Sequence, residues 1–231
     1  MDSTRAIILE RLRSAQSTQA GTHGRGGAPA YEAIPREYQH NGSLDNSEHV
    51  ELFEHRLKEY DAGVYYVAPE NISSTIHKIL DSRGKQNIVV PSGIPSSWLP
   101  EGFTFRIGDG ITPKDLDEFD GVLTACTVAI ALTGSIILQN SGGQGSRKLT
   151  LIPDYHLCIV FADQIVKTVP EAFDRLQPTA TLPTTFISGP SATADIEMTR
   201  IKGVHGPRFL DVLVVKENIR IGDRDELREP P

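Results

Sequence analysis

The chain has 231 residues, 39% of them hydrophobic, and a formal net charge of -7. This length suffices for one sizeable hydrophobic core but not for two. No apolar run approaches the roughly twenty residues that span a bilayer, and the negative charge disfavours contact with a phosphate backbone. We therefore expect neither a membrane span nor a nucleic-acid partner.

The first sixteen residues, MDSTRAIILERLRSAQ, mix charged with apolar positions, unlike the continuous hydrophobic region of a secretory signal. We therefore expect a cytoplasmic protein. Because Ile7, Ile8 and Leu12 recur near the helical period, the sequence predicts an amphipathic helix over residues 3–16. Residues 20–30 are rich in glycine and are predicted to form a flexible linker.

A second helix is predicted over residues 47–60, with Val50, Phe53 and Leu57 on its buried face. After the linker, order is expected to resume slowly, with Ser47 as the N-cap of this helix. The chain is therefore divided into an N-terminal helix and linker (residues 1–46), a single domain (residues 47–220) and a charged tail that frays (residues 221–231).

The first half of this domain alternates between short β-rich runs and helical stretches. Runs of β-branched and aromatic residues predict strands at residues 64–68, 87–91 and 104–108, with a helix over residues 72–83. Strands separated by crossovers as long as a helix pair in parallel, with right-handed connections. This half is predicted to be α/β.

The second half has shorter connections, which changes the expected pairing. A glycine-bearing segment, residues 141–148, separates a predicted strand at 135–139 from apolar runs at 149–153 and 156–162, which favours an antiparallel pair added to the sheet. The predicted fold class is therefore α/β, with a mixed, mainly parallel sheet flanked by helices. The remaining predicted elements are strands at 121–125, 184–188 and 209–215, a short helix or turn at 126–134, and a helix over 163–176.

The two cysteines, Cys126 and Cys158, both lie in apolar surroundings, where a free thiol behaves as a small buried hydrophobe. Iron–sulfur clusters typically need about four thiolates, so we expect no such cofactor on this chain by cysteine ligation alone. No HEXXH pattern occurs, and His49 and His55 are six residues apart, off one helical face. We therefore predict no dedicated metal site.

The segment Ser188 to Gly206, SGPSATADIEMTRIKGVHG, is the leading candidate for a site. It is predicted to form a turn, a short helix and a second turn. Unpaired backbone N–H groups at such a turn bind carboxylate or phosphate, and Ser188, Gly189, Ser191 and Thr193 are the expected anion ligands. An ordinary helix N-terminus capped by serine or threonine is the alternative.

Three titratable residues of the same segment are candidates with equally simple alternatives. Asp195 and Glu197 are possible acid or base groups, but carboxylates in the first turns of a helix are also stabilised by its dipole. Two residues apart on a helix, they point to different faces, which disfavours a catalytic pair. His205, between glycines, is either a group that contacts the anion or an exposed turn residue.

Two further pairs of polar residues lie upstream. Asp154 and His156 are separated by one residue, so on a strand they share a face and form either a site or a hydrogen-bonded pair at the strand entrance. Arg147 and Lys148 follow a glycine-rich turn, where they either hold an anion or form a basic loop tip. The sequence leaves both alternatives open.

Four ordered motifs resemble the LUD-domain family. SGPSATADIE, followed by GVHGP, is similar to its C-terminal signature, and three matches lie upstream: GVLTACTVAIALTGSIIL, GQGSRKLTLIPDYHLCIV and ADQIVKTVPEA. The resemblance implies the fold of glucosamine-6-phosphate deaminases, ribose-5-phosphate isomerases and coenzyme A transferases. In open α/β sheets, ligands bind at the carboxyl ends of strands, and the turn after residues 184–188 is expected at such an end.

The resemblance also selects Thr133 and Gly134 as site residues, because they match the strongest internal motif of the family. The residue before this threonine is usually an acid in the family, whereas this chain has Leu132. If the acid has only a structural role, a leucine is tolerated where the side chain meets apolar surroundings. If the acid is a functional group, this chain lacks it.

The family resemblance implies an accessory subunit of an iron–sulfur-dependent system that oxidises L-lactate to pyruvate. In that hypothesis the chain binds a small organic anion or holds partners together, and iron–sulfur partner proteins carry the electrons. Fold analogy gives a second hypothesis, a stand-alone isomerase or transferase acting on a small phosphorylated or acyl substrate. A metabolite-sensing module is the third.

Overall fold

The computed structural model describes residues 6–11, 14, 46–193, 201–202 and 206–216. Contacts divide the chain into two units, Met1–Tyr38 and Gln39–Pro231, which are described separately. In the first unit, residues 6–11 are helical, as predicted for that stretch, and the side chains of Ile7 and Ile8 are exposed. The predicted linker and charged tail lie outside the described residues.

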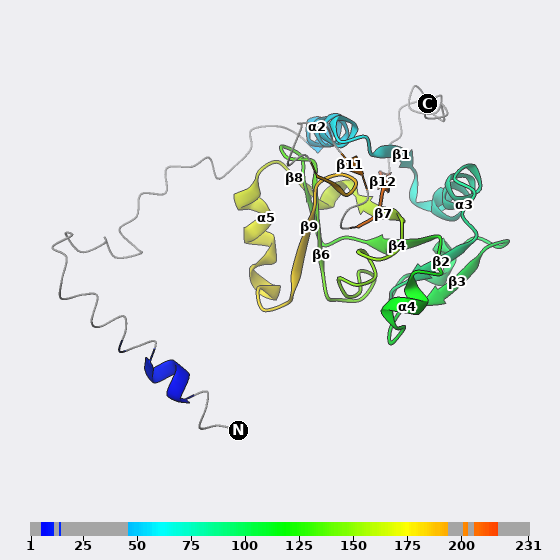
Figure 1. Cartoon of the computed structure of the whole chain (residues 1–231). Coiled ribbons are helices and arrows are strands. Elements are labelled where there is room, and N and C mark those ends of the chain that lie inside the picture. Colours follow the sequence, from blue (N-terminus) through cyan, green and yellow to red (C-terminus); the bar gives the residue numbers. More distant parts are fainter. Residues whose placement is uncertain (1–5, 12–13, 15–45, 194–200, 203–205, 217–231) are drawn as a thin grey trace. The chain divides into compact units, whose positions relative to one another are not determined.

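The second unit contains a six-stranded parallel sheet within its described part (Figure 1). The strand order is β1-β12-β7-β4-β2-β3, and each neighbouring pair runs parallel. This sheet confirms the predicted α/β class with mainly parallel pairing. Its strands are β1 (Gly63–Val67), β2 (Asn87–Val90), β3 (Thr104–Ile107), β4 (Gly121–Ala125), β7 (Tyr155–Phe161) and β12 (Phe209–Val215).

Helices cover the two faces of this sheet. Alternate residues of β7 point to opposite faces, so Leu157 packs with α3 (Ile72–Ser82) while Cys158 packs with α2 (Asn46–Glu59). The helix α2 buries the predicted apolar face, in which Phe53 and Leu57 are fully buried. The burial of Cys126 and Cys158 is likewise confirmed.

A second sheet, of order β8-β5-β6-β9, packs against the α2 side of the first. The strand β6 pairs antiparallel with β5 and β9, whereas β5 and β8 are parallel. The outer face of the second sheet is covered by α5 (Val169–Leu176), whose Ala172 and Leu176 contact it (Figure 1). Its strands are β5 (Val128–Ile130), β6 (Ser135–Gln139), β8 (Ile165–Val166) and β9 (Thr184–Ile187).

Two segments pass from one sheet to the other. The chain leaves the parallel sheet at the end of β4 and, after two connecting residues, enters the second sheet at β5. It does the same after β7, through the short 3-10 turn η4 (Ala162–Gln164), to reach β8. Because β4 pairs parallel with β7 and β5 pairs parallel with β8, the two crossings run side by side.

Several predicted elements of the second half were wrong. The predicted short helix or turn at residues 126–134 contains the strand β5, and only residues 131–134 form a turn. The apolar run at residues 149–153 forms turns and bends. The predicted antiparallel pair does not form, because β6 belongs to the second sheet and β7 to the parallel one. The predicted helix over 163–176 starts only at Val169, because Thr168 caps it by accepting a hydrogen bond from the N–H of Glu171.

The remaining elements are short connections around the two sheets. Thr112 caps α4 by accepting a hydrogen bond from the N–H of Asp115. The strands β10 and β11 form a small antiparallel pair. These elements are α4 (Pro113–Leu116), β10 (Ala192–Thr193), β11 (Ile201–Lys202) and the 3-10 turns η2 (Pro69–Asn71), η3 (Ser96–Trp98) and η5 (Gln177–Thr179).

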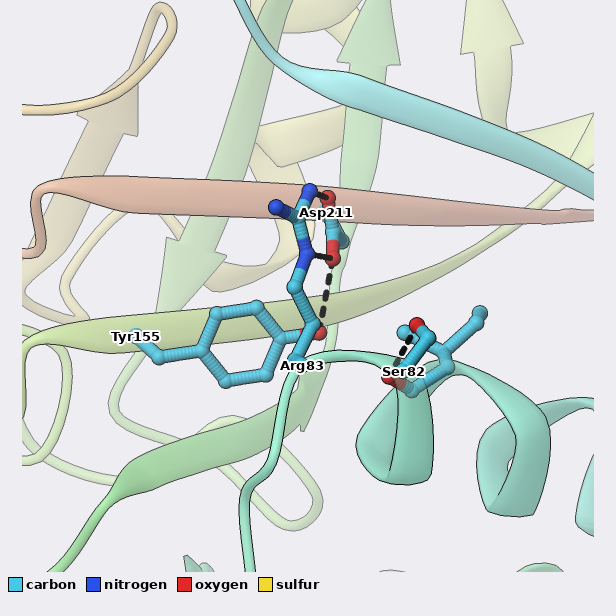
Figure 2. Close-up of polar contacts among 5 residues, drawn as sticks. Ser82, Arg83, Tyr155 and Asp211 are labelled. Carbon is cyan, nitrogen blue, oxygen red and sulfur yellow. Dashed lines mark hydrogen bonds and ion pairs between the residues drawn. The ribbon is translucent and has the colours of Figure 1, made fainter. Parts of the chain in front are cut away.

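A buried ion pair ties the end of α3 to β12 (Figure 2). Arg83 donates from Nε and Nη2 to the two carboxylate oxygens of Asp211, at 2.8 and 2.7 Å, and the Tyr155 hydroxyl donates to Oδ2 at 2.9 Å. Asp211 is completely buried. Gly63 leaves room for this carboxylate, because a Cβ at that position would lie 2.1 Å from Asp211 Oδ1.

Candidate functional site

A pocket of about 260 Å³ opens beside the beginnings of β7 and β12 and the end of β9. The pocket lies where the two sheets meet two loops, residues 145–150 and 188–192. Its polar and charged lining side chains are Arg147, Thr150, His156, Ser188 and Ser191, and its apolar or glycine lining is Phe186, Ile187, Gly189, Pro190, Ala192, Gly206, Pro207 and Leu210.

The position of this pocket corrects the expectation drawn from open α/β sheets. His156 and Leu210, which are paired across β7 and β12, lie near the amino ends of those parallel strands. The predicted strand at residues 184–188 forms β9, but it belongs to the second sheet. The turn that follows it therefore contributes to a site at the amino ends, not the carboxyl ends, of the parallel sheet.

The loop that follows β9 is held in place from both sides. Gly189 has a positive φ of 84°, and a Cβ there would lie 2.4 Å from Tyr60 Cβ, so a glycine lets the loop pass against the end of α2. The N–H of Ser191 donates to the carbonyl of Pro207 at 2.8 Å. This hydrogen bond links Ser191, from the stretch SGPSATADIE, to Pro207, from the stretch GVHGP, at the pocket wall.

Arg147 supplies a cation to the pocket. Its Nη1 donates to the carbonyl and the hydroxyl oxygen of Thr150, at 3.0 and 3.2 Å, which fixes one edge of the guanidinium. No carboxylate of a described residue forms an ion pair with it. Burial lowers the pKa of Arg147 from its ordinary value without an opposing carboxylate, so a bound anion is the natural complement of this charge.

His156 forms part of the buried pocket floor. Its Nε2 lies 2.8 Å from Thr124 Oγ1, and that hydroxyl lies 3.6 Å from Cys158 Sγ. His156 is only 1% exposed and Thr124 is completely buried. These contacts fix the orientation of the imidazole ring before any ligand binds.

A chain of hydroxyl groups ends at the pocket. Thr133 donates to Ser135 at 2.8 Å, and Ser135 Oγ lies 2.6 Å from Ser188 Oγ. Ser135 is only 6% exposed, so its hydroxyl needs partners, and in its bond to Ser188 either hydroxyl can be the donor. The predicted site residue Thr133 thus reaches the pocket indirectly, through Ser135.

The turn around Thr133 explains the neighbouring positions of the family motif. Gly134 has a φ of 59°, and a Cβ there would lie 2.8 Å from Arg56 Cβ, so the turn packs closely against α2. Leu132 is 47% exposed. About half of its side chain therefore faces solvent, so the apolar surroundings expected for a structural role cover it only in part.

Other predicted site residues lie apart from the pocket. Asp154 accepts hydrogen bonds from Arg208 Nε and Nη2, at 2.6 and 2.7 Å, and these bonds lower the pKa of the Asp154 carboxyl. It is not bonded to His156, so the two residues do not form the predicted pair at the strand entrance. Lys148 donates to the carbonyl of Ile111 at 2.7 Å and does not line the pocket.

Three candidates lie outside the described residues: Asp195, Glu197 and His205. For Thr193 the structure describes only that it belongs to β10, which is paired antiparallel with β11. A strand therefore occupies the place where the sequence predicts the start of a helix. Pocket residues flank both undescribed stretches, Ala192 before one and Gly206 after the other.

Sequence patterns did not identify four residues at or next to the pocket. Thr124 is a buried polar residue of β4, and Ser135 is the buried first residue of β6. A polar residue in a buried strand is the signal that could have identified them, since buried hydroxyls need partners. Thr150 and Leu210 carry no comparable local signal. They meet the other residues only through the packing of the two sheets.

The described residues contain neither a candidate metal-ion cluster nor a candidate membrane-spanning helix. Over those residues, no group of three or more histidine, cysteine, aspartate or glutamate side chains is arranged to hold a metal ion. No helix there is both long enough and apolar enough to cross a membrane.

Comparison with known proteins gives a family for this chain. The LUD domain matches residues 110–215. Lactate utilization protein C of Deinococcus radiodurans is 39% identical over 92% of this chain and 97% of its own length, and lactate utilization protein C of Shouchella clausii is 35% identical over 41% of this chain and 43% of its own. A crystal structure of a DUF162 family protein from Deinococcus radiodurans superposes with a TM-score of 0.66 and 38% identity, covering 75% of this chain and 99% of that one. The chain therefore belongs to the LUD-domain family.

Proposed function

We propose that this protein is a subunit of a lactate utilization system, binds a small organic anion in the pocket at Arg147, and acts with iron–sulfur partner proteins that carry the electrons. The names of its relatives support the pathway, since several are lactate utilization protein C. The pocket supports the binding role. The observation that carries the proposal is the guanidinium of Arg147, which lines the pocket and pairs with no described carboxylate.

The chemistry of the pocket suits a carboxylate. Arg147 offers donors beyond the Nη1 that Thr150 occupies, and Ser188 ends a chain of hydroxyls. Hydrogen bonds from a guanidinium to a carboxylate are short and roughly twice as strong as neutral ones. Phe186, Pro207 and Leu210 supply apolar walls for a short carbon chain.

The size of the pocket suits a small ligand. At about 30 Å³ per water molecule, 260 Å³ holds about nine waters. Pockets for drug-sized ligands typically measure about 300–1,000 Å³. A three-carbon acid therefore fits with space for a few waters or for a group contributed by a partner.

The cysteine count supports placing the electron carriers on partners. The chain has two cysteines, and both are buried between the sheets. Since an iron–sulfur cluster typically needs about four thiolates, oxidation of lactate through such clusters requires other chains. The proposed role of this subunit is to bind and orient the acid.

Calorimetric titration with L-lactate, pyruvate and inorganic phosphate tests the binding role. Arg147→Gln removes the cation, and Lys148→Gln is the matched control, because it removes the same charge one residue away, where the side chain is bonded to Ile111. A charge-assisted hydrogen bond contributes about 1.5–3 kcal/mol, so we expect Arg147→Gln to weaken binding of a carboxylate about 10- to 100-fold. The control is expected to stay within about twofold.

The outcomes separate the hypotheses. Equal affinities of wild type and Arg147→Gln for every carboxylate refute the proposed site. Binding of phosphate alone, with turnover of a phosphorylated substrate by the isolated chain, moves the assignment to a stand-alone enzyme. Purification of the full-length chain from lactate-grown cells tests the partners, and recovery without any iron-containing protein contradicts that part of the proposal.

A further inference from the structure

We infer that the pocket selects a 2-hydroxy acid over the corresponding 2-oxo acid, because His156 presents a hydrogen-bond acceptor to it while Arg147 and Ser188 present donors. This inference rests on the proposed binding of a small organic acid and specifies its chemical class. It concerns recognition only. It depends on where the hydrogens of two hydrogen-bond chains lie, one buried at His156 and one that ends at the exposed Ser188.

The first chain fixes the tautomer of His156. Thr124 has one hydroxyl hydrogen, and that hydroxyl contacts both Cys158 Sγ, at 3.6 Å, and His156 Nε2, at 2.8 Å. With its hydrogen directed to the sulfur, the Thr124 oxygen accepts from Nε2–H. Neutral His156 then carries its lone pair on Nδ1, because a neutral imidazole has one donor and one acceptor nitrogen.

The acceptor nitrogen is the one available to the pocket. Nε2 is occupied by Thr124, and this is the hydrogen bond found at this ring among the described residues. His156 belongs to the pocket lining. A ligand that satisfies this nitrogen must supply a donor, and a hydroxyl group does so.

The second chain delivers a donor. With Thr133 as the donor to Ser135, the buried Ser135 hydroxyl directs its own hydrogen to Ser188. Ser188 then accepts from Ser135 and keeps its hydrogen for the pocket. Together with the guanidinium of Arg147, Ser188 thus supplies donors, which are the complement of a carboxylate.

A 2-hydroxy acid satisfies both sides, whereas close analogues do not. The hydroxyl at C2 donates to Nδ1 while the carboxylate accepts from Arg147 and Ser188. A ketone at C2 has no hydrogen to donate, and a methylene at C2 has neither donor nor acceptor. A site that hydrogen-bonds a hydroxyl discriminates strongly against analogues that lack it, because the buried polar group is left unpaired.

Calorimetry with L-lactate, pyruvate and propionate tests this selection. We expect wild type to bind L-lactate at least about tenfold more tightly than either analogue, as loss of one buried hydrogen bond implies. Thr124→Val removes the group that fixes the tautomer and is expected to reduce the preference to about threefold or less. Thr124→Ser keeps the hydroxyl and should retain the preference. Thr127→Val is the control, because Thr127 is bonded to Gln144 and does not line the pocket.

Nitrogen NMR of the imidazole gives a readout that does not depend on affinity. In the neutral ring of wild-type His156, we expect the shift of a bare Nδ1 and of a protonated Nε2. The opposite tautomer overturns the inference. Because this measurement needs only folded protein, it also decides the case if Thr124→Val does not fold.

The outcomes distinguish this inference from the proposed function. Equal affinities for the three acids, all dependent on Arg147, overturn the selection and leave the proposed binding site intact. A preference for L-lactate that persists in Thr124→Val places the discrimination elsewhere and also overturns it. Failure of every acid to bind removes the proposed function, and this inference with it.

Discussion

The ion pair between Arg83 and Asp211 offers a sharp test of the fold, because the chain contains a second pair of the same geometry at its surface. Asp211 and Asp154 each accept two hydrogen bonds from one arginine, at 2.7 and 2.8 Å in the first pair and at 2.6 and 2.7 Å in the second. The side chain of Asp211 is 0% exposed, whereas that of Asp154 is 36% exposed. The substitutions Asp211→Asn and Asp154→Asn therefore make one chemical change at two levels of burial.

The magnitudes follow from what each substitution leaves behind. Removing one partner of a buried pair costs about 3–5 kcal/mol, because the remaining charge is uncompensated. Arg83 keeps 22% of its side chain exposed, and asparagine still accepts a hydrogen bond from Tyr155, so we expect the lower end, about 3 kcal/mol. An exposed pair contributes no more than about 1 kcal/mol.

Urea unfolding at neutral pH measures both effects. With an m value of about 2–3 kcal/mol/M, a loss of 3 kcal/mol lowers the midpoint by about 1–1.5 M. Asp154→Asn should shift it by at most about 0.5 M. Equal shifts for the two variants, or a shift below about 0.3 M for Asp211→Asn, would refute the assignment of Asp211 as a buried structural anchor.

Three further predictions concern stability. Gly63→Ala places a Cβ 2.1 Å from Asp211 Oδ1, so it should cost about 1–3 kcal/mol; a cost no greater than that of Gly142→Ala, where the nearest atom to a Cβ would be Ser92 O at 4.0 Å, contradicts the packing. Thr168→Ala removes the cap of α5 and should cost about 0.5–2 kcal/mol in urea unfolding, while an unchanged midpoint argues against the capping box. The lowered pKa of Asp154 predicts a stabilising contribution that is present above the unfolded pKa of about 3.9 and lost as the pH falls through the folded value. Unfolding of wild type and Asp154→Asn at pH 7 and pH 2 measures it, and a difference that grows as the pH falls has the wrong sign.

Local patterns predicted much of the parallel sheet. The runs at residues 64–68, 87–91 and 104–108 formed β1, β2 and β3, and the helix between the first two formed α3. The strands follow from the sequence because they are runs of β-branched and aromatic residues. The helix α3 follows because its buried residues, Ile72, Ile76, Ile79 and Leu80, recur near the helical period. The fully buried runs of β7 and β12 were also recognisable from their apolar character.

The second sheet was not predictable in the same way. The strand β5 spans only three residues, and its boundary with β4 is marked by two residues without a turn signal. Partners of β6 lie on either side of it in space but far apart along the chain, at β5 and β9. A short glycine-containing connection suggested a local hairpin, whereas the glycines serve a loop that returns the chain to the parallel sheet.

The candidate site was predicted in composition but not in position. Four of the predicted anion ligands, Ser188, Gly189, Ser191 and Arg147, line one pocket together with His156, a predicted acid or base. Their binding of an anion stays a prediction. Its location at the amino ends of β7 and β12 depends on the pairing of the two sheets, which no local pattern contains. The supporting hydroxyls of Thr124 and Ser135 became evident only through their distances to His156 and Ser188.

A structure of the protein crystallised with L-lactate tests the central claim most directly. The account predicts the acid in the pocket between β7, β9 and β12, with a carboxylate oxygen about 2.7–2.9 Å from an Arg147 nitrogen and the C2 hydroxyl within hydrogen-bonding distance of His156 Nδ1. An acid bound at the carboxyl ends of the parallel strands, with no contact to Arg147, would contradict it.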